Sequence, residues 1–119
     1  MKAKGYMGRV LWVDLTRGTS EVRPLEDDTA EKYIGGSGLG TRILYDETTP
    51  ATDPLGPENT LIFAVGPLVG TGIFNSNRYS GVSKSPLTGH YGEANSGGHW
   101  GGAFKKCGYD GLVVTGASG

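Results

Sequence analysis

The chain has 119 residues, of which 22 are glycine and one is cysteine, and its net charge at pH 7 is −1. Because nucleic acids and acidic membranes both attract a basic surface, this balance argues against either as a partner. A single cysteine excludes an internal disulfide and any four-cysteine zinc or iron–sulfur site built from this chain alone. Since 36% of the residues are apolar and no segment repeats, we expect one folded domain over residues 1–119 rather than collagen or disorder.

The first predicted element is a β-hairpin. Residues 9–15 (RVLWVDL) are rich in β-branched and aromatic side chains, residues 16–19 have turn chemistry, and residues 20–23 form a second short strand that Pro24 ends. The apolar run at 10–13 is too short for a secretory signal, so a reducing, cytoplasmic setting is the expectation.

Two short helices are predicted next. Asp28 and Glu31 have the spacing of a capping box, and the first helix is expected to run to Ile34 before glycines stop it. Ser37 is expected to cap a second helix that continues through Tyr45.

Three strands separated by loops follow. The run Leu61–Val65 is expected to be a strand buried on both faces, and it is far too short to cross a membrane, which takes ~20 residues. The other predicted segments are the loops 46–59 and 66–77 and the short strands 78–83 and 91–94.

The last predicted helix has one apolar face. Its members recur at i, i+3, i+4 and i+7 and are Trp100, Ala103, Phe104 and Cys107. On this pattern Cys107 is a small buried hydrophobe, and Asn95 and Ser96 stand at the start of the helix. Strand 109–115 closes the chain. The predicted fold class is α+β, with short helices packed on a mixed β-sheet and the element order β-β-α-α-β-β-β-α-β.

Four glycines between Asn95 and Phe104 are the strongest hint of a site. Each glycine in a helix lowers helix stability by roughly 1 kcal/mol relative to alanine, so a cluster of four indicates a specific structural or functional role. The pairs Gly97/Gly101 and Gly98/Gly102 predict a bare groove beside the apolar face. The groove suits a flat ligand with an anion such as phosphate at the helix start, or equally tight packing against another element of the same protein.

Other candidate residues give weaker signals. Arg78 opens a predicted strand and could make a bidentate contact to a phosphate or a carbonyl, or could be an exposed strand-end charge. His90 and His99 have no third ligand at metal spacing and are expected to be ordinary hydrogen-bonding histidines. The glycine clusters at 35–40 and 66–72 lack the spacing of a dinucleotide fingerprint and of a phosphate-binding P-loop.

Ordered motifs give the chain a specific resemblance. The runs KSPLTG (84–89), ANSGG (94–98) and GYD (108–110), together with GPL (66–68) and NRY (77–79), resemble the N-terminal domain of the aldehyde ferredoxin oxidoreductase family. The resemblance extends over nearly the whole chain.

The resemblance implies a function. Family members are tungsten, sometimes molybdenum, enzymes of anaerobes that oxidise aldehydes to carboxylic acids and pass electrons to ferredoxin, and some act on other carbonyl or acyl-thioester substrates. Their metal is held by two pterins beside one 4Fe–4S cluster. By this resemblance Arg78 contacts the pterin, the backbone carbonyl of Asn95 helps bind a magnesium ion that bridges the pterin phosphates, and Ser96 and Gly97 belong to the same cofactor-binding turn.

The resemblance also implies what the chain lacks. In the family the cluster cysteines, the groups near the metal and the contacts to the second pterin come from later segments, and Cys107 matches none of the cluster positions. We therefore expect half of a cofactor cradle, in a fragment or in one piece of a split enzyme that works with remaining domains or a partner subunit. The alternatives are a non-catalytic binding or assembly module that docks on a partner chain, and a generic phosphate-binding domain.

Overall fold

The computed structural model describes residues 2–119 and contains three helices and six strands in the predicted order. The α+β class is confirmed. The elements are β1 (Arg9–Asp14), β2 (Thr19–Pro24), α1 (Asp27–Tyr33), α2 (Gly36–Glu47), β3 (Leu61–Val65), β4 (Tyr79–Lys84), β5 (Tyr91–Ser96), α3 (Trp100–Lys106) and β6 (Gly111–Thr115).

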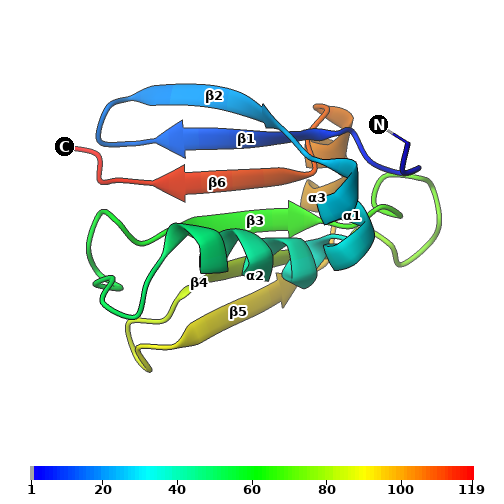
Figure 1. The fold of residues 1–119 in the computed structure, drawn as a ribbon. Coiled ribbons are helices and arrows are strands. Elements are labelled where there is room, and N and C mark those ends of the chain that lie inside the picture. Colours follow the sequence, from blue (N-terminus) through cyan, green and yellow to red (C-terminus); the bar gives the residue numbers. More distant parts are fainter. Residues whose placement is uncertain (1) are drawn as a thin grey trace.

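The six strands form one mixed sheet in the order β2-β1-β6-β3-β4-β5 (Figure 1). β1 and β6 run parallel, and every other neighbouring pair is antiparallel. The edge strands are therefore β2 and β5. Pro24 ends β2, as expected of a residue that cannot donate a ladder hydrogen bond.

The core lies between the sheet and the helices α1 and α2, which cover one face (Figure 1). Ile62, Val82 and Val113 are fully buried beneath them. α2 can lie this close to β4 because Gly40 has no side chain: a methyl group there would come within 2.9 Å of a Val82 methyl carbon. In β3, Ile62 and Ala64 are fully buried on the face that the helices cover. On the other face Val65 is also fully buried but Leu61 is 41% exposed, so the prediction of a strand buried on both faces holds only at the C-terminal end of β3.

The helix starts differ from the predicted caps. α1 begins after Glu26 with no side-chain cap, and Asp28 lies within the helix, where it forms an ion pair of 2.9 Å with Lys32. α2 begins after Gly35, so Ser37 lies in its first turn and does not cap it. At the start of α2 the difference accompanies the tight link between the helices, in which Ile34 has a φ of +64°. α2 also runs to Glu47, into the predicted loop.

A buried ion pair fastens α3 to the rest of the fold. Lys105 Nζ lies 2.8 Å from a carboxylate oxygen of Asp110 and also donates to the Gly66 carbonyl at 3.1 Å. Asp110 in turn accepts the backbone N–H groups of Met7 and Gly8 at 3.1 and 2.7 Å. These hydrogen bonds compensate the desolvation of both charges. They join the N-terminal segment, the 66–77 loop, α3 and β6 at one end of the sheet.

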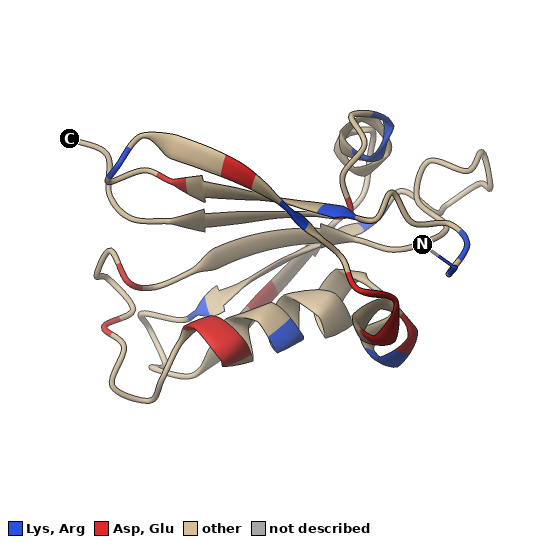
Figure 2. Cartoon of the chain, turned by 45° about the horizontal axis from the view of Figure 1, so that its top comes forward, with Lys and Arg blue, Asp and Glu red and all other residues tan. Residues whose placement is uncertain are grey.

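Charges of both signs are dispersed over the surface (Figure 2). Acidic residues gather on α1, basic residues on the last turn of α3, and β3 and β6 carry none. Across residues 2–119, no helix has the length and apolar character that a membrane span requires.

Candidate functional site

The predicted site residues meet at one end of the sheet, where β4 begins and β5 ends. Tyr79 pairs with Ser96 in the antiparallel register of these strands. Arg78 directly precedes Tyr79, and Gly97 directly follows Ser96, so these two residues face each other across the strand ends. Strand pairing thus brings together residues that are almost twenty positions apart in the sequence.

Arg78 is exposed just ahead of β4, which begins one residue later than predicted. Its guanidinium makes no hydrogen bond or ion pair with any residue of the range 2–119. A guanidinium presents five donors in a planar fork that matches a phosphate or a carbonyl. The side chain is therefore available to an incoming acceptor.

Asn95 and Ser96 are the last residues of β5, not the start of the helix as predicted. The Asn95 side chain is held at both ends: Oδ1 accepts a hydrogen bond from Ser80 Oγ at 2.7 Å, and Nδ2 donates to Glu93 Oε1 at 3.1 Å. The Ser96 side chain is exposed, and its hydroxyl lies 3.5 Å from the Gly97 carbonyl oxygen. The position of Asn95 is thus fixed by its neighbours in the sheet.

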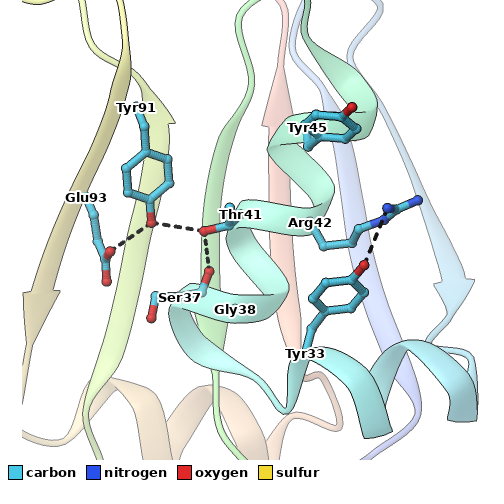
Figure 3. Close-up of a pocket in the computed structure, with 8 residues that line it drawn as sticks. All are labelled: Tyr33, Ser37, Gly38, Thr41, Arg42, Tyr45, Tyr91 and Glu93. Atoms are coloured by element: carbon cyan, nitrogen blue, oxygen red, sulfur yellow. Dashed lines mark hydrogen bonds between the residues drawn. The ribbon is translucent and has the colours of Figure 1, made fainter.

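The hydrogen bonds continue from Glu93 towards α2. Tyr91 donates to Glu93 Oε2 at 2.8 Å, and the Thr41 hydroxyl lies 3.0 Å from the Tyr91 hydroxyl (Figure 3). The hydrogen bonds from Tyr91 and Asn95 lower the pKa of Glu93 below its ordinary value. Partial burial, with Glu93 beside it, raises the pKa of Tyr91. The carboxylate is therefore held in its charged form beside the neutral phenol.

A cavity of about 610 Å³ lies next to this network, between α2 and the edge strand β5. Figure 3 shows Tyr91 and Glu93 on its strand side, and Tyr33, Arg42 and Tyr45 on its helix side. Arg42 is engaged by Asp46 at 2.9 Å. The residues that line the cavity do not include Arg78, Asn95, Ser96 or Gly97.

The four glycines of the predicted groove divide into two pairs. α3 begins only at Trp100, and methyl groups added to Gly97 or Gly98 would meet no atom within 4 Å. Gly101 and Gly102 are buried, and a methyl group on either would press against Asn77. The prediction of one continuous groove is wrong. The first pair is open backbone, and the second is packed inside the protein.

The apolar face of α3 is not its core face. The buried residues of the helix are Gly101, Gly102 and Lys105. Trp100 is 39% exposed and stacks on Phe104 with 4.9 Å between ring centroids. The predicted burial of Cys107 is likewise wrong, because this residue is exposed. The helix turns its glycines inward since a bare backbone approaches the loop more closely than aromatic rings could.

Four aromatic rings, of which Trp100 is exposed and the others are half-buried, form a layer that we call the aromatic shelf; its members are Phe63, Tyr79, Trp100 and Phe104. Trp100 lies 4.5 Å from Tyr79 and 5.8 Å from Phe63, between ring centroids. The shelf starts at Tyr79, the residue after Arg78. A layer of rings of this kind offers apolar surface on which a flat group could rest.

His90 and His99 are exposed, and neither imidazole hydrogen-bonds another residue of the range 2–119. Nor do three or more His, Cys, Asp or Glu side chains in this range come together as a metal site. What the site offers is an arginine, open backbone and aromatic surface.

Sequence reasoning missed the residues that support the site. Tyr91 and Glu93 alternate with the predicted site residue Asn95 along a strand, and this period of two could have placed them on the same face as Asn95. Asn77 and Lys105 carried no local signal, because each acts through contacts with distant segments.

Comparison with known proteins gives one consistent result. The sequence model of the family described as "Aldehyde ferredoxin oxidoreductase, N-terminal domain" matches residues 10–119. The chain is 46% identical over 112 residues to a tungsten-containing aldehyde ferredoxin oxidoreductase of Pyrococcus furiosus, which corresponds to 94% of this chain and 18% of that protein. It is 40% identical to a second protein of that organism, the WOR-like subunit of an aliphatic sulfonate oxidoreductase, over 93% of this chain and 18% of the relative.

A solved structure is similar over the same extent. It is the active-site complex BamBC of benzoyl coenzyme A reductase in complex with 1,5-dienoyl-CoA, with a TM-score of 0.94 and 38% sequence identity. The match covers 97% of this chain and 18% of that chain. Like the curated relatives, the solved chain is thus more than five times as long as the segment described here.

Proposed function

Because the chain belongs to the aldehyde ferredoxin oxidoreductase family, we propose that residues 1–119 are the first part of the N-terminal domain of a tungsten- or molybdenum-pterin oxidoreductase. In this proposal the chain supplies half of the cradle for the pterin cofactor. The observation that carries it is that Arg78 and Gly97 both adjoin the terminal pair of the β4–β5 ladder, Tyr79 and Ser96, at the end of the sheet that also has open backbone and the aromatic shelf.

The residues present fit such a cofactor. A pterin is flat and carries a phosphate, so it calls for an apolar surface, a cation and backbone that it can approach closely. The aromatic shelf, Arg78 and the open backbone of Gly97 and Gly98 meet these three needs.

Each residue has a proposed role. The Arg78 guanidinium holds negative charge or a carbonyl of the pterin through a bidentate contact. The backbone carbonyl of Asn95 would help hold a magnesium ion at the pterin phosphates, and Ser96 and Gly97 would seat the phosphate end. Ser80 and Glu93 hold the Asn95 side chain at both ends and so keep this turn in place.

The bound metal would supply two-electron oxidation of an aldehyde to a carboxylic acid, with electrons passing through a 4Fe–4S cluster to ferredoxin. The cluster ligands would come from remaining domains or a partner subunit. The two-subunit name of the BamBC complex supports a partner chain. An aldehyde is the substrate we propose, since it is named in the first of the two Pyrococcus relatives, and the cytoplasm of an anaerobe is the proposed setting.

Replacement of Arg78 tests this function. We expect Arg78→Ala to lower the tungsten and pterin content per chain of the assembled enzyme, measured by mass spectrometry after purification without oxygen. Arg17→Ala is the matched control, because that arginine is also exposed but lies at the β1–β2 turn. Full cofactor content with unchanged turnover in Arg78→Ala would rule out the proposed role.

A further inference from the structure

α3 rests on the 66–77 loop through its two buried glycines. A methyl group added to Gly101 would lie 2.7 Å from the carbonyl oxygen of Asn77, and one added to Gly102 would lie 3.2 Å from Asn77 Oδ1. A carbon at 2.7 Å from a backbone oxygen is not tolerated without movement of one partner. Glycine is therefore required at 101 for the helix to lie where it does.

The Asn77 carbonyl belongs to the peptide group that leads into Arg78. Since a peptide group is planar, any displacement of this oxygen also turns the backbone nitrogen of Arg78. The other side of Asn77 is held as well, because its Oδ1 accepts the Gly70 N–H at 3.1 Å. Gly101 and Gly70 thus fix Asn77 from two directions.

The direction of the Arg78 side chain depends on this backbone. Within residues 2–119 the guanidinium has no hydrogen-bond or ion-pair partner, so no polar contact holds it in one direction. Its Cα is placed by β4 on one side and by Asn77 on the other. The ion pair of Lys105 and Asp110 anchors α3, and with it the surface that Asn77 presses against.

The geometry points to Gly101 as a positioning residue for the cofactor. Because Gly101 has no side chain, the Asn77 carbonyl packs directly against the helix backbone. This contact orients the Asn77–Arg78 peptide group and thereby directs the Arg78 guanidinium towards the pterin. Gly102 supports the same contact through the Asn77 side chain. Neither glycine touches the cofactor. This inference rests on the pterin-binding role proposed above for Arg78.

A double-mutant cycle in the assembled enzyme tests the inference. The variants are Gly101→Ala, Arg78→Ala and the two combined, and the readout is tungsten and pterin retained per chain after dialysis without oxygen. Gly66→Ala is the matched control, because it makes the same change in the contacting loop, where a methyl group meets no atom within 4 Å. We expect Gly101→Ala to lower retention by roughly tenfold, the effect of losing a charge-assisted hydrogen bond, and Gly66→Ala to have no effect.

The combined variant separates positioning from general damage. If Gly101 acts through Arg78, the double variant retains as much cofactor as Arg78→Ala alone. Additive losses, or retention in Gly101→Ala equal to that in Gly66→Ala, would overturn the inference and leave the role of Arg78 intact. Full retention in Arg78→Ala would overturn both. Should Gly101→Ala fail to assemble, Gly102→Ala takes its place in the cycle, since its contact of 3.2 Å is milder.

Discussion

Lys105 and Asp110 form an ion pair of 2.8 Å whose side chains are 3% and 0% exposed, and it joins α3 to the start of β6. Asp110 also receives backbone N–H groups from the N-terminal segment, and Lys105 reaches the loop after β3. A single buried pair thus connects four segments of the chain beneath the proposed cofactor site.

Removal of the Lys105 side chain should destabilise the fold. Lys105→Ala leaves the Asp110 carboxylate buried without its cation, and we expect the free energy of unfolding to fall by about 3–5 kcal/mol. Chemical denaturation measures the change. Lys106→Ala, one residue further along the same helix but exposed, should stay within about 0.5 kcal/mol of the wild type. Equal effects of the two substitutions would contradict the anchoring role of the pair.

For a substitution of Thr60 we expect the free energy of unfolding to change in the opposite direction. It is 1% exposed, and within residues 2–119 its hydroxyl has no hydrogen-bond partner. Thr60→Val removes the unpartnered group and keeps the shape, so we expect unchanged or higher stability, by up to about 1 kcal/mol. Thr48→Val is the contrast, because the Thr48 hydroxyl donates to the Leu44 carbonyl at 2.7 Å, and this substitution should destabilise. A destabilised Thr60→Val variant would show that the hydroxyl has a partner in solution.

Ile34 lies in a strained link between α1 and α2. Its φ is +64° and its ψ is −69°, and the Gly35 N–H donates to the Tyr33 carbonyl across it at 2.7 Å, which makes a tight γ-turn. The Ile34 side chain is 62% exposed, so little packing is lost on its removal. We expect Ile34→Gly to raise the free energy of unfolding by about 1 kcal/mol through relief of strain. Ile34→Ala, which keeps the strain, should not. Equal stability of the two variants would refute the strained turn.

The pH dependence of Glu93 has a defined sign. Its pKa in the folded chain is lowered from 4.5 by the hydrogen bonds from Tyr91 and Asn95. The unfolded chain therefore binds more protons than the folded chain below pH 4.5, and the stabilisation is complete above that pH and lost as the pH falls through the lowered pKa. Nuclear magnetic resonance titration of Glu93 should give a midpoint below 4.5, and Tyr91→Phe should move it upwards. The same Glu93 midpoint in the wild type and in Tyr91→Phe would contradict the hydrogen-bond network.

The order of the elements followed from local patterns. The hairpin of β1 and β2 was predictable because a segment rich in β-branched and aromatic residues is followed by a turn and a second short strand, and β3 because five apolar residues stand together between loops. The helix caps were not, since the two-residue link at Ile34 and Gly35 leaves no room for the predicted geometry. Such a link depends on how α1 and α2 pack, which periodicity does not encode.

The site was predictable only in part. Arg78 and the Asn95–Gly97 turn were singled out, yet their approach depends on the register of β4 and β5. The apolar pattern of α3 gave a wrong prediction of its buried face, because apolar periodicity identifies one face of a helix but not the surface against which that face packs. Here the bare face of Gly101 packs inside, and Trp100 stays partly exposed. At this helix the close packing of backbone against backbone, rather than the apolar side chains, determines which face is buried.

The most direct test of the central claim is metal and pterin analysis, by mass spectrometry, of the chain purified without oxygen from the organism that makes it. The account predicts tungsten or molybdenum together with pterin, in a species larger than the 12.4 kDa of this chain. An intact, folded assembly that contains the chain but neither the metal nor the pterin would contradict it.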